Sequence, residues 1–322
     1  MAMEKGKPAP VRGAGSDISS RRHALALMLG AWGWLPRALA AADVGAPLRL
    51  AISETLVADV NLNDARAAMV IWLKRLMADL NLVIEFNPRV FDTTEEILRR
   101  ARGGQLDAVA LNVVEYRQIA DVLDTSQIMG EIGAAGMERY LLLAKRNSGI
   151  QHLGDLRGRR LSKWKAPKMC VADAWLTTIL DEGRFGQSEQ FFGPVATDAK
   201  VSRVVLPVFF GLADACLTTK RGFDMMCELN PQVAKELNAI ASSPAMVLCF
   251  YAFRRNYHGV SRDSFSRVCS SLRSNAAGRQ LETLFQFGEL TVRDASCLTS
   301  ALGILDAAER VRGRPGAGSR RG

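Results

Sequence analysis

Short apolar segments alternate with amphipathic segments along most of this chain, and this alternation restricts its fold more than any other feature. In the segment LDAVAL at 106–111, five of six residues are apolar, which predicts a buried strand. The other expected elements of this part are a strand at 48–53, a helix at about 64–80 capped by Asn63 or Asp64, a strand at 82–86, and a helix opening with a capping box at Thr93 and Glu96. Strands separated by helices are typical of a mostly parallel, doubly wound sheet.

The same alternation begins again near residue 138, and the chain ends in helices. The expected elements are a strand starting the segment 138–150, strands at 214–217 and 245–253, and helices at 171–180, 261–274, 277–287 and 296–311. One lobe interrupted by another predicts an α/β clamshell in which the chain crosses near 135–140 and 244–250. The predicted parts are 41–137 plus 246–309 for lobe 1, 138–245 for lobe 2, and a basic disordered tail at 310–322.

The N-terminal 40 residues have the pattern of a cleaved export signal. Arg21 and Arg22 precede an apolar run that ends at Leu35, and Ala38-Leu39-Ala40 is a small-x-small cleavage site. The paired arginines resemble a twin-arginine signal. The apolar run is too short to span roughly 30 Å of hydrocarbon, so a membrane anchor is the weaker alternative. We expect a periplasmic protein.

The net charge of +9 lies at the two ends of the chain. Residues 1–40 carry a net charge of +4 and residues 310–322 carry +5, so the body between them is neutral. A neutral body without a basic stripe argues against a nucleic-acid partner.

The side chains that usually form metal and catalytic sites are sparse after residue 40. The six cysteines include no C-x-x-C pair, and the only histidines there are His152 and His258, so we expect no metal site and no cofactor. The cysteines are either disulfide-bonded, as a periplasmic location allows, or buried thiols. No G-x-S-x-G, H-E-x-x-H or Gly-rich phosphate loop occurs, so we do not expect an enzyme.

Four segments resemble the phosphonate/phosphite/phosphate solute-binding proteins of ABC importers over roughly residues 47–290. They are LRLAIS with the following NDARAAMVIWLKRL, LDAVALNVVEY, IQHLGDLRGRRLS, and VVLPVFFGLADACLTT. The resemblance implies the type II periplasmic binding fold, a monomer, and capture of a small anionic solute between two lobes for a membrane ABC permease. A sensor or accessory subunit of a membrane signalling or redox system is the alternative role for such a fold.

The strand ends of the first lobe supply five candidate ligand-binding residues, namely Ser53, Glu54, Asn112, Glu115 and Tyr116. In open α/β sheets, ligands bind beyond the carboxyl ends of strands, where helix N-termini present free N–H groups to an oxyanion. The resemblance places an aromatic residue near Tyr116. Tyr116 packed between loop and helix, and Glu115 as an exposed charge at a helix start, are the structural alternatives.

The second lobe supplies the candidates Ser162, Lys165, Lys200, Thr218 and Asp224. The family's S-x-S-G-like turn, which holds phosphonate oxygens, is replaced here by SKWKAPKMCVADAW, with three lysines around Trp164. Either a lysine and Trp164 bind a different or larger anion, or the lysines are a solvated run. Asp224 would meet an ammonium group of the ligand, or is a helix-end charge.

Overall fold

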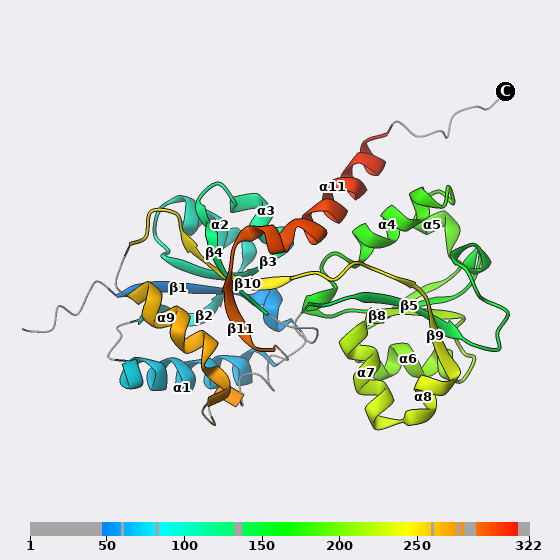
Figure 1. Cartoon of the computed structure of the whole chain (residues 1–322), viewed down its shortest axis with the longest axis horizontal. Coiled ribbons are helices and arrows are strands. Elements are labelled where there is room, and N and C mark those ends of the chain that lie inside the picture. Colours follow the sequence, from blue (N-terminus) through cyan, green and yellow to red (C-terminus); the bar gives the residue numbers. More distant parts are fainter. Residues whose placement is uncertain are drawn as a thin grey trace, which may run out of the picture. The chain divides into compact units, whose positions relative to one another are not determined.

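The computed structural model describes residues 47–58, 61–80, 84–131, 137–258, 261–274, 276, 278–279 and 288–314 (Figure 1). The predicted export signal, most of the helix predicted at 277–287 and the end of the predicted tail lie outside these residues. No helix within the described ranges is long and apolar enough to cross a membrane.

The first sheet has the strand order β11-β4-β10-β3-β1-β2. Its strands are β1 (Leu48–Ser53), β2 (Ile84–Asp92), β3 (Ala108–Asn112), β4 (Leu123–Glu131), β10 (Cys249–Arg254) and β11 (Leu290–Arg293). β1 pairs in parallel with β2 and β3, whereas β10 lies antiparallel between β3 and β4. The carboxyl ends of β1 and β3 therefore meet at the same edge.

Helices cover both faces of the first sheet (Figure 1). They are α1 (Leu62–Leu80), α2 (Thr94–Arg102), α3 (Val113–Ile119), α9 (Ser261–Ser270) and α11 (Thr299–Gly313). Leu50 and Ile52 pack with α1 and α9, while the intervening Ala51 belongs to the cluster that contains buried residues of α2, α3 and α11. This division follows from the alternation of side chains along a strand.

The second sheet has the strand order β7-β6-β8-β5-β9. Its strands are β5 (Tyr140–Lys145), β6 (Leu161–Trp164), β7 (Val195–Asp198), β8 (Ala215–Thr219) and β9 (Leu237–Ser242). Its helices are α4 (Ala172–Glu182), α5 (Ser188–Phe191), α6 (Val201–Phe209), α7 (Lys220–Leu229) and α8 (Pro231–Glu236). Leu141 and Leu143 of β5 pack with α6, α7 and α8, whereas Leu142 packs into the cluster that contains α4.

The chain passes from the first sheet to the second between β4 and β5, and returns between β9 and β10. The two connections touch at an antiparallel bridge, in which the Glu138 and Met246 backbones each donate a 2.9 Å hydrogen bond to the other. The predicted crossings near 135–140 and 244–250 include these residues.

Three expectations need correction. α1 begins at Leu62 and is capped by Asn61, whose Oδ1 accepts from the N–H groups of Asn63 (2.9 Å) and Asp64, so the prediction of Asn63 or Asp64 as the cap was wrong. Parallel pairing is limited to three neighbouring strands in each sheet, because β10 and β5, the strands that follow the two crossings, run the opposite way. α11 continues to Gly313, so residues 310–313 are helical and do not belong to a disordered tail.

The six cysteines all lie within the described residues, and none of them forms a disulfide bond. They are Cys170, Cys216, Cys227, Cys249, Cys269 and Cys297. Of the two alternatives left open by the sequence, the structure has the reduced one.

Candidate functional site

A group of hydroxyl, amide and carboxylate side chains lies where β1 and β3 end, and we call Ser53, Thr55, Thr94, Asn112 and Glu115 the Glu115 cluster. Glu115 Oε1 accepts hydrogen bonds from the hydroxyls of Ser53 (2.6 Å), Thr55 (3.2 Å) and Thr94 (2.5 Å). Glu115 Oε2 accepts from the backbone N–H of Asn112 (2.9 Å), and the Asn112 side chain accepts from the Glu115 backbone N–H (3.0 Å). This reciprocal pair is a capping box that starts α3.

The Glu115 cluster brings together three of the residues predicted from the sequence, but they bind one another. Glu115 is buried, so it is not the exposed charge of the structural alternative. The carboxylate takes the hydroxyl donors that an oxyanionic ligand would need, and it would repel such a ligand.

The other two candidates of the first lobe lie apart from this cluster. Tyr116 is only 4% exposed and packs edge-to-face on Phe250, with ring centroids 5.3 Å apart. Burial raises the pKa of Tyr116. Tyr116 is therefore a packing residue, but its ring lies on a residue of β10 and not between loop and helix as the alternative had it. Glu54 is partly buried at the start of the 3₁₀ turn η1 (Glu54–Val57).

The candidates of the second lobe are scattered. Ser162 is buried in β6 and Thr218 in β8, while Lys165 and Lys200 are exposed. Asp224 accepts a 2.6 Å hydrogen bond from Lys220 on the surface of α7. The structure therefore does not gather these five side chains into one site.

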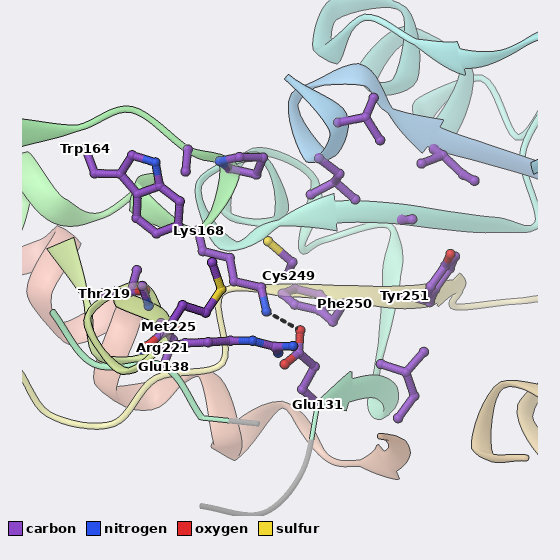
Figure 2. Close-up of a pocket in the computed structure, with 18 of the residues that line it drawn as sticks. Glu131, Glu138, Trp164, Lys168, Thr219, Arg221, Met225, Cys249, Phe250 and Tyr251 are labelled. Atoms are coloured by element: carbon purple, nitrogen blue, oxygen red, sulfur yellow. Dashed lines mark hydrogen bonds and ion pairs between the residues drawn. The ribbon is translucent and has the colours of Figure 1, made fainter. Parts of the chain in front are cut away.

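A pocket of about 920 Å³, including its solvent-open space, is lined by residues from both sheets and none of the ten candidates (Figure 2). We call it the Arg221 pocket. The second sheet contributes Trp164 at the end of β6, Lys168 in the turn η3 (Pro167–Met169), Thr219 at the end of β8, and Arg221 and Met225 in α7. The first sheet contributes Ile52, Glu131 and residues of β10 and β11.

The residues that line the pocket include two carboxylic acids and two cations. Lys168 Nζ donates to Glu131 Oε1 at 2.6 Å, so an ion pair joins η3 of the second sheet to β4 of the first. Glu138 accepts from the backbone N–H groups of Arg139 and Arg221, and burial raises its pKa. Among the residues that the structure describes, no ion pair involves the Arg221 guanidinium.

One wall of the pocket is held in place by a glycine. The Trp164 indole N–H donates to the backbone oxygen of Ala199 (3.0 Å), which fixes the ring over α7. A Cβ added at Gly222 would lie 2.9 Å from Trp164 Cζ3 and 2.8 Å from Thr218 Oγ1. The ring and the first turn of α7 can therefore meet this closely only because residue 222 has no side chain.

Comparison with known proteins decides the family. A family described as "ABC transporter, phosphonate, periplasmic substrate-binding protein" matches residues 57–296, about three-quarters of the chain. The chain belongs to this family. No curated protein sequence matches it significantly.

Several solved structures share the fold of this substrate-binding protein. A binding-protein component of an ABC phosphonate transporter from Pseudomonas aeruginosa is 14% identical, with a TM-score of 0.55 over 85% of this chain and 91% of that one. PhnD1 from Prochlorococcus marinus, in complex with methylphosphonate, is 12% identical, with a TM-score of 0.54 over 82% and 98%. The aliphatic sulphonate binding protein SsuA from Escherichia coli is 14% identical, with a TM-score of 0.51 over 83% and 87%. At these identities the likeness establishes the fold, which is the predicted type II periplasmic binding fold with two lobes.

Thr218 and Lys165, which were predicted from the sequence, lie within three positions of residues that line the pocket. Thr219 lines the pocket while the predicted Thr218 is buried one position earlier, because successive side chains of β8 point to opposite faces. The suggestion that a lysine and Trp164 form the site fits the pocket, but the lysine that lines it is Lys168 and the predicted Lys165 is not among its lining. No sequence pattern marked Arg221 as a ligand-binding residue, apart from its position just after a buried strand.

No cluster of three or more His, Cys, Asp or Glu side chains suited to a metal ion occurs within the described residues. What the pocket offers a ligand is a guanidinium, an ammonium already bonded to a carboxylate, and a hydroxyl, set in an apolar wall.

Proposed function

We propose that the protein captures an oxyanionic solute in the Arg221 pocket and delivers it to the membrane permease of an ABC importer. The observation that carries this proposal is a guanidinium without an ion-pair partner among the described residues, in a pocket lined from both sheets. Arginine suits oxyanions because its fork of N–H donors matches two ligand oxygens. Membership of the family supports the delivery role.

Binding in this proposal is a closure of two lobes and involves no chemistry, so the protein is not an enzyme. Lobe 1 (41–137 plus 246–309) and lobe 2 (138–245) move about the two crossings and enclose the solute. The Lys168–Glu131 ion pair joins the two sheets in this structure, so in this proposal it breaks when the lobes open and forms again when they close. The protein works as a monomer in the periplasm after export, by the twin-arginine route, and cleavage of residues 1–40.

The ten ligand contacts predicted from the sequence remain predictions, and none of them lines the Arg221 pocket. The Arg221 pocket is the stronger proposal because three of those residues already satisfy one another in the Glu115 cluster.

The test is thermal unfolding of the protein purified from the periplasm, with phosphate, phosphite, alkyl phosphonates, sulfonates, carboxylates and amino acids. A solute at 100 times its dissociation constant should stabilise the fold by about 2.7 kcal/mol. We expect an oxyanion to raise the melting temperature, and Arg221→Gln to abolish the shift. Lys220→Gln is the matched control, because Lys220 is the preceding residue and pairs with Asp224 on the surface. No shift with any compound would reject the proposal.

The second candidate is a ligand-responsive sensor or accessory subunit of a membrane signalling or redox system. The altered segment 162–175 favours it, since the hydroxyl-rich turn of the transport family is replaced there by lysines and Trp164. Affinity capture from solubilised membranes separates the roles, because a permease would be recovered with the transport protein and a kinase with the sensor.

A further inference from the structure

The wall of the Arg221 pocket is mostly apolar, and this bears on what kind of anion it takes. The first lobe supplies Leu56, Val57, Met69 and Leu290, and the second lobe supplies Trp164 and Met225. A bare inorganic oxyanion has no apolar group, so it would leave these apolar side chains in contact with water. Apolar walls with a few placed polar groups are typical of sites for organic ligands.

The charges in the pocket nearly cancel. Lys168 is bonded to Glu131, which is 5% exposed, so this pair presents little net charge to a ligand. Glu138, 8% exposed, adds a second carboxyl group that is held by backbone N–H groups. Arg221 is then the one cation of the described lining without an ion-pair partner (Figure 2). Arg221 can therefore pair with one negative charge of a ligand, while a second ligand charge would stay unpaired near Glu131.

The pocket wall formed by Trp164 is preorganised. The indole of Trp164 is fixed by its hydrogen bond to Ala199 and by contact with the start of α7 at Gly222. Because the Trp164 ring is already fixed, it loses little side-chain entropy when an apolar group of a ligand packs against it.

We infer that the Arg221 pocket takes a monoanionic organic acid bearing an alkyl or aryl group, a sulfonate or a carboxylate, with its oxyanion on Arg221 and its apolar group against Trp164, Met225 and Met69. This inference rests on the proposed function and narrows its solute class. It departs from a small dianionic phosphonate as the preferred ligand.

The test is titration calorimetry of the full protein in alkaline buffer, where an alkyl phosphonate carries two charges and a sulfonate one. The probes are methanesulfonate, hexanesulfonate, hexanoate, methylphosphonate and hexylphosphonate. Each methylene that the pocket covers should tighten binding about fourfold, the equivalent of about 0.8 kcal/mol. We expect hexanesulfonate to bind at least about tenfold tighter than methanesulfonate, because of its longer chain. We expect a similar margin, at least about tenfold, over hexylphosphonate, because the second charge of the phosphonate finds no cation.

Variants at the start of α7 distinguish binding by Arg221 from a general effect of removing a positive charge. Arg221→Gln should weaken hexanesulfonate at least about tenfold, Arg221→Lys should lose less because it keeps the charge, and Lys220→Gln should change nothing. Unfolding curves without ligand check that each variant is folded.

The outcomes distinguish the inference from the proposed function. If methylphosphonate binds as tightly as hexanesulfonate, the solute class is wrong and the capture role stands. If hexanesulfonate binding survives Arg221→Gln, the site is wrong. If none of the probes or the wider oxyanion panel binds, the capture role fails as well.

Discussion

The Glu115 cluster and the Arg221 pocket both gather polar side chains at the ends of buried strands, but they differ in how those side chains are satisfied. In the Glu115 cluster, three hydroxyls and a backbone N–H converge on one carboxylate. In the pocket, a guanidinium has no ion-pair partner among the described residues. The comparison teaches that polar residues at a strand end indicate a ligand site only when their hydrogen-bonding capacity is left over.

The largest expected effect is on the Glu115 cluster. Glu115→Ala leaves the hydroxyls of Ser53, Thr55 and Thr94 and the N–H of Asn112 without their acceptor. We expect the free energy of unfolding to fall by about 2–4 kcal/mol, measured by urea denaturation.

Glu96→Ala is the control for that change, because Glu96 forms an exposed pair with Arg99 on α2 and its loss should not measurably change stability. If Glu115→Ala instead left stability intact and altered solute affinity, the cluster would be the binding site and the comparison would be reversed.

The next effect tests how the pocket wall is built. Gly222→Ala places a methyl group against Trp164 and Thr218, at distances that require the ring or the helix start to move. Overpacking of this kind costs about 1–3 kcal/mol, although alanine is the better helix former. We expect a lower melting temperature and weaker hexanesulfonate binding.

Gly303→Ala in α11 provides the contrast, since nothing lies near the added methyl there and the helix should gain stability. Equal behaviour of the two variants would show that the wall does not depend on Gly222.

A third change alters the charge of the pocket. Glu131→Gln removes the negative charge bonded to Lys168 and leaves a side chain of nearly the same shape. We expect methylphosphonate to bind about tenfold tighter, equivalent to about 1.4 kcal/mol, because a second cation then faces the ligand.

Glu236→Gln is its control, because Glu236 pairs with Lys145 at 3.8 Å on the surface of the second lobe. A methylphosphonate affinity unchanged by Glu131→Gln would mean that charge balance does not set the preference for a monoanion.

The smallest effect is a pH dependence. Burial, the largest influence, raises the pKa of Glu138 above its ordinary value of 4.5, so the folded protein holds this proton more tightly than the unfolded chain. The stability that this group contributes is therefore fully present below about pH 4.5 and is lost as the pH rises through the raised pKa. Glu138→Gln should remove this loss, so the melting-temperature difference between variant and parent should grow in favour of the variant as pH rises. A difference that stays constant with pH would contradict it.

The order of helices and strands was largely predictable, because residues that face the core recur along the sequence with the period of the element they belong to. Leu50 and Ile52 face one layer and Ala51 the other, and a window that shows this alternation defines the strand. The capping oxygen of Thr93, which accepts from the Glu96 backbone N–H, was also predictable, but the Glu96 carboxylate binds Arg99 and does not complete the expected capping box. The cap at Asn61 was missed because neighbouring Asn63 and Asp64 satisfy the same rule, and only the backbone path selects one of them.

The binding site was much less predictable, because it depends on which face of a strand each side chain occupies and on which groups it hydrogen-bonds. Thr218 and Thr219 have the same side chain, but only Thr219 lines the pocket, because successive side chains of a strand point to opposite faces. Whether Glu115 or Glu131 is available to a ligand depends on which donors reach it from distant parts of the chain. Such pairings carry no local sequence signal.

The lining of the Arg221 pocket runs in sequence from Ile52 in β1 to Leu290 in β11. A growing polypeptide that has reached only β9 possesses Trp164 and Arg221 but lacks β10 and β11, so one wall of the pocket does not yet exist. A solute present during synthesis therefore cannot help an unfinished chain to fold. It stabilises only the completed molecule, so bound solute can serve as a reporter of chains that have finished folding.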